Sequence, residues 1–168
     1  MCNKHNAILI SHKWYIYISL INIQIPASVE NIYGGAFAHC TSLAQVIFGE
    51  GSKIESIDQY TFNYCESLEN IHVPAKVKYI YEYAFHNCKS LKNIHIPASV
   101  EHIYGAAFAF CINLVDIIFE PDSQLKSIDE YAFYNCNLLE KISSIIPKTA
   151  IHRKGGKGDK GGKGDKGD

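Results

Sequence analysis

The sequence lacks any uninterrupted apolar run long enough to cross a bilayer. Its most apolar stretch, residues 8–25, is broken by His12, Lys13, Asn22 and Gln24, whereas a transmembrane helix needs about 20 mostly apolar residues. The same stretch lacks the clean apolar centre and the small-residue cleavage site of a secretion signal. We therefore expect no membrane insertion and a cytoplasmic protein, with the cell surface as the alternative.

A strong charge of either sign is also missing. The formal net charge is −1 over 168 residues, and residues 153–168 carry six Lys or Arg against three Asp, a local charge of +3 that leaves the rest near −4. Nucleic-acid binding requires a basic patch or stripe. The body of the chain has none, so we expect no nucleic-acid partner.

Motifs that carry chemistry are absent as well. None of the six cysteines forms a C-x-x-C pair, although zinc sites draw their ligands from such short spacings. No set of nucleophile, base and acid recurs, and no Gly-rich phosphate loop follows a strand. The sequence predicts a protein that is not an enzyme and that holds no cofactor and no metal ion.

What the sequence does contain is a repeat. Five times a Phe is followed three residues later by a Cys, and three residues later again by a Leu. The phenylalanines are Phe37, Phe62, Phe85, Phe108 and Phe133, the cysteines are Cys40, Cys65, Cys88, Cys111 and Cys136, and the leucines are Leu43, Leu68, Leu91, Leu114 and Leu139. A fixed period of this kind indicates a repeat architecture, in which each unit buries its apolar face against its neighbours.

A three-residue segment begins three residues after each Leu, and we call it the triplet. The triplets begin at Ile23, Val46, Ile71, Ile94, Ile117 and Ile142, in steps of 23, 25, 23, 23 and 25 residues. The two longer steps contain FGEGSKI (48–54) and FEPDSQL (119–125), where the shorter steps have a compact I/V-P-A-x-V. A two-residue insertion explains both.

Each repeat changes its hydrophobic period along its length. The first and third residues of the triplet are apolar and the middle residue differs from them. This alternation is typical of a strand whose first and third side chains face the core and whose middle side chain faces out. A second short extended piece follows, and then Ala36, Phe37, Cys40 and Leu43 fall on one face of a helix about two turns long. Each repeat thus has a strand followed by a short helix, with no antiparallel strand between one triplet and the next. This order predicts a solenoid in which the strands of successive repeats pair in parallel, about 4.8 Å apart.

The recurring pattern L-x-x-I-x-I-P-x-x-V-x-x-I-x-x-x-A-F-x-x-C-x-x-L resembles the BspA-like, or Treponema pallidum type, leucine-rich repeat, over residues 23–142 closely and over 9–22 weakly. The resemblance implies an α/β repeat solenoid: a right-handed, curved leucine-rich-repeat array with a concave parallel β-sheet and short helical turns on the other side. It also implies the binding of proteins or surfaces. Members of the family are bacterial surface adhesins and also occur in protists and some giant viruses, so the host-cell cytoplasm or the virion would be the compartment of a viral member.

The pattern predicts four parts of the chain. We expect a degenerate N-terminal cap repeat in residues 1–22, five repeats in 23–141, a C-terminal cap in 142–152 and a disordered Gly/Lys/Asp tail in 153–168. An unrelated hairpin or ragged start remains the alternative for the first part. Glycine at every third position makes the tail resemble collagen, but without proline a flexible solvated tail is favoured over a triple helix.

The middle residues of the triplets should form one continuous row on the concave sheet. This predicted partner-binding row consists of Gln24, Ile47, His72, His95, Ile118 and Ser143, and the row beside it consists of Asn22, Gln45, Asn70, Asn93, Asp116 and Lys141. His72 and His95 could hold a metal ion only with a third and fourth ligand. We therefore predict a protein-binding scaffold of undetermined oligomeric state, with a structural or surface-coat component as the alternative.

The five repeated cysteines have a simpler explanation than chemistry. Each lies between a Phe and a Leu of the core face, where a free Cys behaves as a small apolar residue. We expect reduced, buried thiols.

Overall fold

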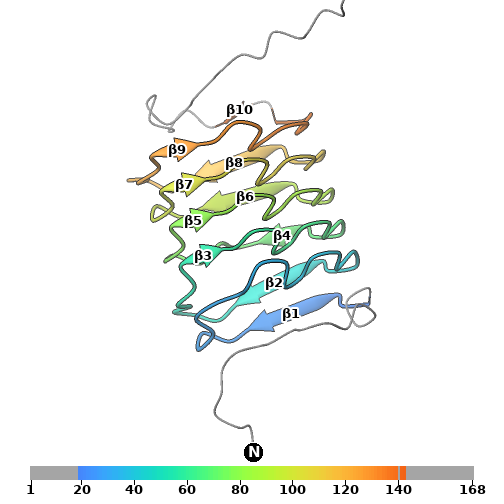
Figure 1. Ribbon diagram of the computed structural model, residues 1–168, viewed down its shortest axis with the longest axis vertical. Coiled ribbons are helices and arrows are strands. Elements are labelled where there is room, and N and C mark those ends of the chain that lie inside the picture. The colour runs from blue at the N-terminus through green and yellow to red at the C-terminus, as the bar shows by residue number, and fades with distance from the viewer. Residues whose placement is uncertain (1–18, 140, 143–168) are drawn as a thin grey trace, which may run out of the picture.

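The computed structural model of the protein describes residues 19–139 and 141–142. They form a stack of similar coils, each contributing short strands (Figure 1). The ten strands are β1 (Asn22–Ile25), β2 (Gln45–Phe48), β3 (Ser56–Ile57), β4 (Asn70–Ile71), β5 (Tyr79–Ile80), β6 (Asn93–Ile96), β7 (His102–Ile103), β8 (Asp116–Phe119), β9 (Ser127–Ile128) and β10 (Lys141–Ile142). The predictions for residues 1–18 and for the C-terminal cap and tail beyond Ile142 lie outside the described residues.

The strands form two stacks, and every pairing is parallel. The triplet strands build one stack, in which β1-β2-β4 and β6-β8-β10 are joined by a bridge between His72 and His95. The second stack is β3-β5-β7-β9, built from the second extended piece of every described repeat except the first, in which residues 29–33 form no strand. Figure 1 shows the stacks as two columns with arrows in opposite directions, as expected for strands on two sides of one coil. The predicted parallel solenoid is confirmed.

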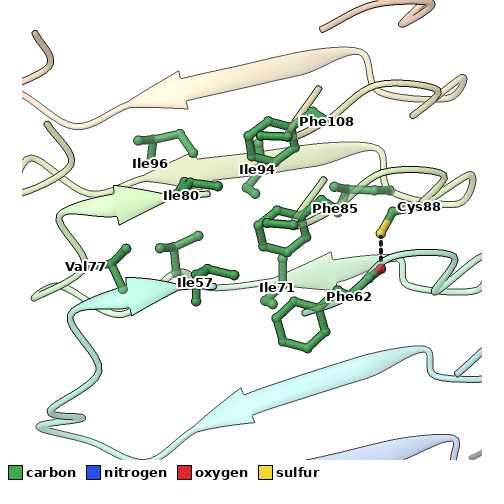
Figure 2. Close-up of a cluster of buried hydrophobic side chains, with 14 of the residues drawn as sticks. Ile57, Phe62, Ile71, Val77, Ile80, Phe85, Cys88, Ile94, Ile96 and Phe108 are labelled. Atoms are coloured by element: carbon green, nitrogen blue, oxygen red, sulfur yellow. Dashed lines mark hydrogen bonds between the residues drawn. The ribbon is translucent and has the colours of Figure 1, made fainter. Parts of the chain in front are cut away.

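The core lies inside the coils. Apolar residues of the triplets and of the second strands are buried there together with the repeated phenylalanines. Phe85 is stacked between Phe62 and Phe108, with ring centroids 5.4 and 5.0 Å away (Figure 2). Each ring therefore gains contacts from the repeats on both sides, which is the nearest-neighbour stabilisation expected of a solenoid.

The short helices expected after each second strand are not confirmed, since none of the described residues forms a helix. Residues 34–39 form successive turns instead. In each repeat two residues, four positions apart, have positive φ angles, as do Tyr83 (59°) and Asn87 (61°). A left-handed residue interrupts a right-handed helix, so the apolar spacing is kept without an α-helix.

Hydrogen bonding explains why turns replace the helix. The N–H groups of His86 and Cys88 donate to carbonyls three residues back, at 3.2 Å each. The alternating N–H groups of Phe85 and Asn87 donate instead to Ala107 and Ala109 of the next repeat, at 2.7 and 2.9 Å. An α-helix would use all of these donors internally, whereas this arrangement joins one repeat to the next.

The prediction of buried thiols is confirmed for four cysteines. Cys40, Cys65, Cys88 and Cys111 are free and buried, and Cys136 is half-buried at the last full repeat. Burial raises the pKa of the Cys40 thiol to about 11 and that of the Cys136 thiol to about 12. Because the thiolate is the reactive form, these pKa values indicate inert thiols.

Candidate functional site

The middle residues of the triplets lie on the outer surface of the triplet strands. Gln24, Ile47, His72 and His95 are exposed, and Ile118 is half-buried. Register places Gln24 beside Ile47 and His95 beside Ile118. The alternation inside and outside follows from the pleat of a strand, which turns successive side chains to opposite faces.

The adjacent predicted row has a similar placement. Asn22, Gln45, Asn70 and Asn93 are exposed, and Asp116 is half-buried. Gln45 pairs with both Asn22 and Asn70, while Asp116 pairs with Asn93 and Lys141. We call the surface made by the two rows the triplet face; its described members are Gln24, Ile47, His72, His95, Ile118, Asn22, Gln45, Asn70, Asn93 and Asp116.

Two predicted members of this surface cannot be assessed. Ser143 lies outside the described residues, and for Lys141 only the strand position is described. Within 19–139, the ten remaining residues of the two rows lie on the six-strand stack as expected from the repeat register.

The paired imidazoles at the centre of the triplet face are close neighbours. The ring centroids of His72 and His95 are 6.2 Å apart, with their planes inclined by 36°. Among the described residues, no three His, Cys, Asp or Glu side chains are grouped so that they could hold a metal ion. The arrangement offers hydrogen-bond donors and acceptors to a ligand, since each neutral imidazole provides one of each.

Two exposed apolar residues near the triplet face were missed by the sequence analysis. Ile21 is 59% exposed and Val115 is 48% exposed, each one residue before its strand. The corresponding positions in the repeats between them are Ala44, Glu69 and Lys92. A large apolar residue at a position that holds Ala44, Glu69 or Lys92 in the repeats between was the available signal.

A hollow also interrupts the triplet face. Its volume is about 320 Å³, and it opens between β2 and the chain that follows β4. The lining residues are Gln45, Val46, Ile47, Phe48, Gly49, Gly51, Ser52, Asn70, His72, Val73, Pro74, Ala75 and Lys76. The sequence analysis did not identify this feature, although it noted the insertion that causes it.

The hollow arises where a long repeat stacks on a compact one. β1 pairs with β2 over four residues up to Phe48, but β2 pairs with β4 only up to Val46 and Ile71. The inserted segment lies against the preceding repeat. The Gly49 N–H donates to the Ile25 carbonyl at 2.8 Å, and the Gly49 backbone is so close to Ala27 that a Cβ there would come within 2.7 Å of the Ala27 nitrogen. Its other side is therefore left open.

The second stack of strands has a different surface. Immediately before β3, β5, β7 and β9 stand Glu55, Lys78, Glu101 and Lys126, a row of alternating charge. Lys78 contacts Glu55 at 3.1 Å, and Lys126 contacts Glu101. The hydrogen bond from Lys126 lowers the pKa of Glu101.

Aromatic side chains also gather on this second surface. Tyr81 is stacked on Tyr104 with ring centroids 4.9 Å apart, and Tyr79 lies against His102 at 5.9 Å. They belong to or directly follow β5 and β7 rather than the triplet strands. The second surface is therefore separate from the triplet face, and its tyrosines can be replaced as a control when binding to the triplet face is tested.

Over residues 19–139 and 141–142, the structure has no helix with the length and hydrophobicity needed to span a bilayer.

Several solved structures resemble this chain. A leucine rich cell surface protein from Faecalibacterium prausnitzii is 35% identical, with a TM-score of 0.58, over 60% of this chain and 26% of its own. The T. pallidum leucine rich repeat protein is 26% identical, with a TM-score of 0.56, over 71% of this chain and 67% of its own. A leucine-rich repeat protein from Eubacterium ventriosum is 21% identical with a TM-score of 0.66, over 77% of this chain and 34% of its own, which shows a common fold.

The chain spans only 26% and 34% of the lengths of the proteins from F. prausnitzii and E. ventriosum. A comparison with curated protein sequences finds no match. The pattern of the BspA type leucine rich repeat region matches residues 8–140 in six copies. Since this match covers most of the sequence and agrees with the parallel solenoid, the chain belongs to the BspA type leucine-rich repeat family.

Proposed function

We propose that this protein is a non-enzymatic interaction scaffold that binds a protein partner on its triplet face. The observation that carries the proposal is that the exposed middle row of this face contains no carboxylate, lysine or arginine from Gln24 to Ile118. The centres of protein interfaces are depleted of charged residues. An apolar-edged row with imidazoles at its centre has that composition.

The opposite character of the second stack supports this choice of face. Its charged row of Glu55, Lys78, Glu101 and Lys126 is typical of a solvated surface, where exposed ion pairs contribute little to stability. Ile47, by contrast, is 45% exposed on the triplet face. A passive spacer has no need of an isoleucine there, whereas a partner would remove it from water.

Family membership is consistent with this proposal, because leucine-rich repeats commonly serve in protein interaction and are generally not enzymes. The concave curvature implied by the family would favour a partner that inserts into the array.

A footprint of the bound partner would test the choice of face. The intact chain, immobilised, would be used to isolate a partner, and amide hydrogen exchange would then be compared with and without it. The proposal predicts slower exchange around His72, His95 and Ile118, with little change around Tyr81 and Tyr104. Slowing confined to the second stack would contradict the proposal.

A second candidate function is a cell-surface structural component, with the solenoid as a spacer and the Gly-X-Y tail for association. It is favoured by the 35% identity to a leucine rich cell surface protein. Deleting residues 153–168 tests it by sedimentation velocity. This candidate predicts self-association that is lost with the tail, whereas a scaffold that acts through the triplet face keeps its partner affinity after the deletion.

A further inference from the structure

The hollow between β2 and the chain after β4 has the size of a small binding site. Its volume of about 320 Å³ lies at the lower end of the range for small-molecule sites, roughly 300–1,000 Å³. At one end of the lining the strands are paired, Gln45 with Asn70 and Val46 with Ile71, and the pairing stops beyond that point. A site of this size and shape suits the end of a peptide better than a strand that passes through.

The walls of the hollow are partly apolar, and an apolar residue also borders its opening. Val46, Val73 and Pro74 are buried, and Phe48 is half-buried. Ile47 lies at the exposed side. Phe48 and Ile47 are the apolar lining residues that still meet water, and an aliphatic side chain placed there would cover them.

The polar part of the lining consists of groups that can donate hydrogen bonds. Gln45, Asn70, His72 and Lys76 each carry an N–H donor, and Ser52 carries a hydroxyl. No Asp or Glu is among the lining residues. Among the residues that the structure describes, Lys76 is not a member of any of the ion pairs.

We propose that this hollow binds the C-terminal residue of a partner peptide, with an aliphatic side chain among Phe48, Val73 and Pro74 and the free carboxylate at Lys76 and His72. The inference rests on the proposed function, since the hollow interrupts the triplet face. Charge complementarity selects the occupant: a cation and several donors without a carboxylate match an anion, and the apolar walls match the side chain next to it.

The probe for this site is N-acetyl-L-leucine, which carries both features of a C-terminal leucine. N-acetyl-L-leucinamide lacks the carboxylate, and N-acetylglycine lacks the side chain. Each would be titrated into the isotope-labelled full chain while the amide chemical shifts of residues 45–52 and 70–76 are followed. A ligand of this size should bind with a dissociation constant of about 1 mM, as its few atoms allow.

Two lysine variants supply the matched comparison. Lys76→Gln removes the cation at the hollow, whereas Lys92→Gln removes an exposed lysine one repeat away that does not line it. We expect Lys76→Gln to weaken N-acetyl-L-leucine binding about three- to fivefold, the effect of one exposed charge pair. Lys92→Gln should leave binding unchanged, and the two control ligands should bind the wild-type chain more weakly.

Three results would overturn the proposal: no local shifts at about 20 mM N-acetyl-L-leucine, a concentration well above the expected dissociation constant; equal binding of the leucinamide; or equal loss in the two lysine variants. Both lysines are exposed, so folding is preserved in each variant. The test is separate from that of the proposed function. If the hollow stays empty while a partner still slows exchange around His95 and Ile118, only the assignment of the hollow fails.

Discussion

The Cys88 thiol donates a hydrogen bond to the main-chain carbonyl of Phe62 in the preceding repeat, with Sγ and O 3.3 Å apart (Figure 2). The same carbonyl accepts the N–H of Cys65 at 3.1 Å. One oxygen therefore closes a turn within its own repeat and ties that repeat to the next.

The same relationship recurs along the array. The other pairs are Cys65 with Phe37, Cys111 with Phe85 and Cys136 with Phe108, at 3.2, 3.1 and 3.1 Å. Cysteine suits this position because it is small and apolar and yet has a weak S–H donor. The repeated cysteine is thus explained by packing and hydrogen bonding, without metal or disulfide chemistry.

Replacing Cys88 by Ala should lower the free energy of unfolding by about 1–2 kcal/mol, because it removes both the donor and buried volume. Cys136→Ala, at a half-buried site in the last full repeat, should cost less. Urea unfolding of the two variants checks the difference. Because both thiols donate to a carbonyl of the preceding repeat, equal losses would mean that the fuller burial of the central thiol adds nothing.

The stability of the protein should fall as the pH rises above about 9. The folded-state pKa of Cys40 is raised from 9.0 to about 11 by burial. Below pH 9 both states hold the proton and the stabilisation is complete; between about 9 and 11 the unfolded chain loses its proton first, so the free energy of unfolding declines.

The Cys40→Ser variant isolates this contribution from that of the other titrating groups. Its free energy of unfolding should decline less between pH 8 and 11 than that of the wild-type chain. Parallel pH profiles for the two proteins would show that the Cys40 thiol does not contribute to the alkaline loss of stability.

Replacing Phe85 by Ala should cost about 3–5 kcal/mol, the usual range for a buried Phe. Phe85 is fully buried between two rings, whereas Phe133 is half-buried and stacked on Phe108 at 5.3 Å. Phe133→Ala should therefore cost clearly less in thermal unfolding. The same loss for both would contradict the nearest-neighbour account of stability.

Ala106→Gly should stabilise the protein slightly, by up to about 1 kcal/mol. Ala106 has a φ angle of 56°, and a left-handed residue with a Cβ is strained by about 1–2 kcal/mol, which outweighs the greater flexibility of glycine in the unfolded chain. Inside an α-helix the same change would cost about 1 kcal/mol. The sign of the change in urea midpoint thus distinguishes the observed turns from the helix expected from sequence.

The sequence predicted the parts of the fold that depend on burial. The regular spacing of Phe85, Cys88 and Leu91 identifies residues that reach the core, and all three are fully buried. The same spacing was interpreted as a helix, because periodicity reports which side chains face inward and not how their backbone is bonded. The left-handed turns depend on hydrogen bonds between Asn87 and the next repeat, which no local pattern reveals.

The candidate site was predicted in the same partial way. The outward positions of Ile47, His72 and His95 follow from strand alternation and were predicted correctly as exposed. The hollow was not predicted, because it depends on how an inserted segment in one repeat meets Pro74 in the next. Such a mismatch appears only when the repeats are stacked in three dimensions.

The most direct test of the triplet face compares partner affinity in two variants of the intact chain. One carries His72→Glu and His95→Glu. The other carries Tyr33→Ser, Tyr81→Ser and Tyr104→Ser, at the tyrosines that follow the second extended piece of the three compact repeats. Thermal unfolding would first show that both variants are as stable as the wild-type chain. Titration calorimetry with the isolated partner then gives the dissociation constants.

If the triplet face binds the partner, the histidine variant should bind at least about tenfold more weakly, a loss of about 1.4 kcal/mol or more. The tyrosine variant should keep the wild-type dissociation constant. Loss of binding in the tyrosine variant, with full affinity in the histidine variant, would contradict the account and identify the second stack of strands as the binding surface.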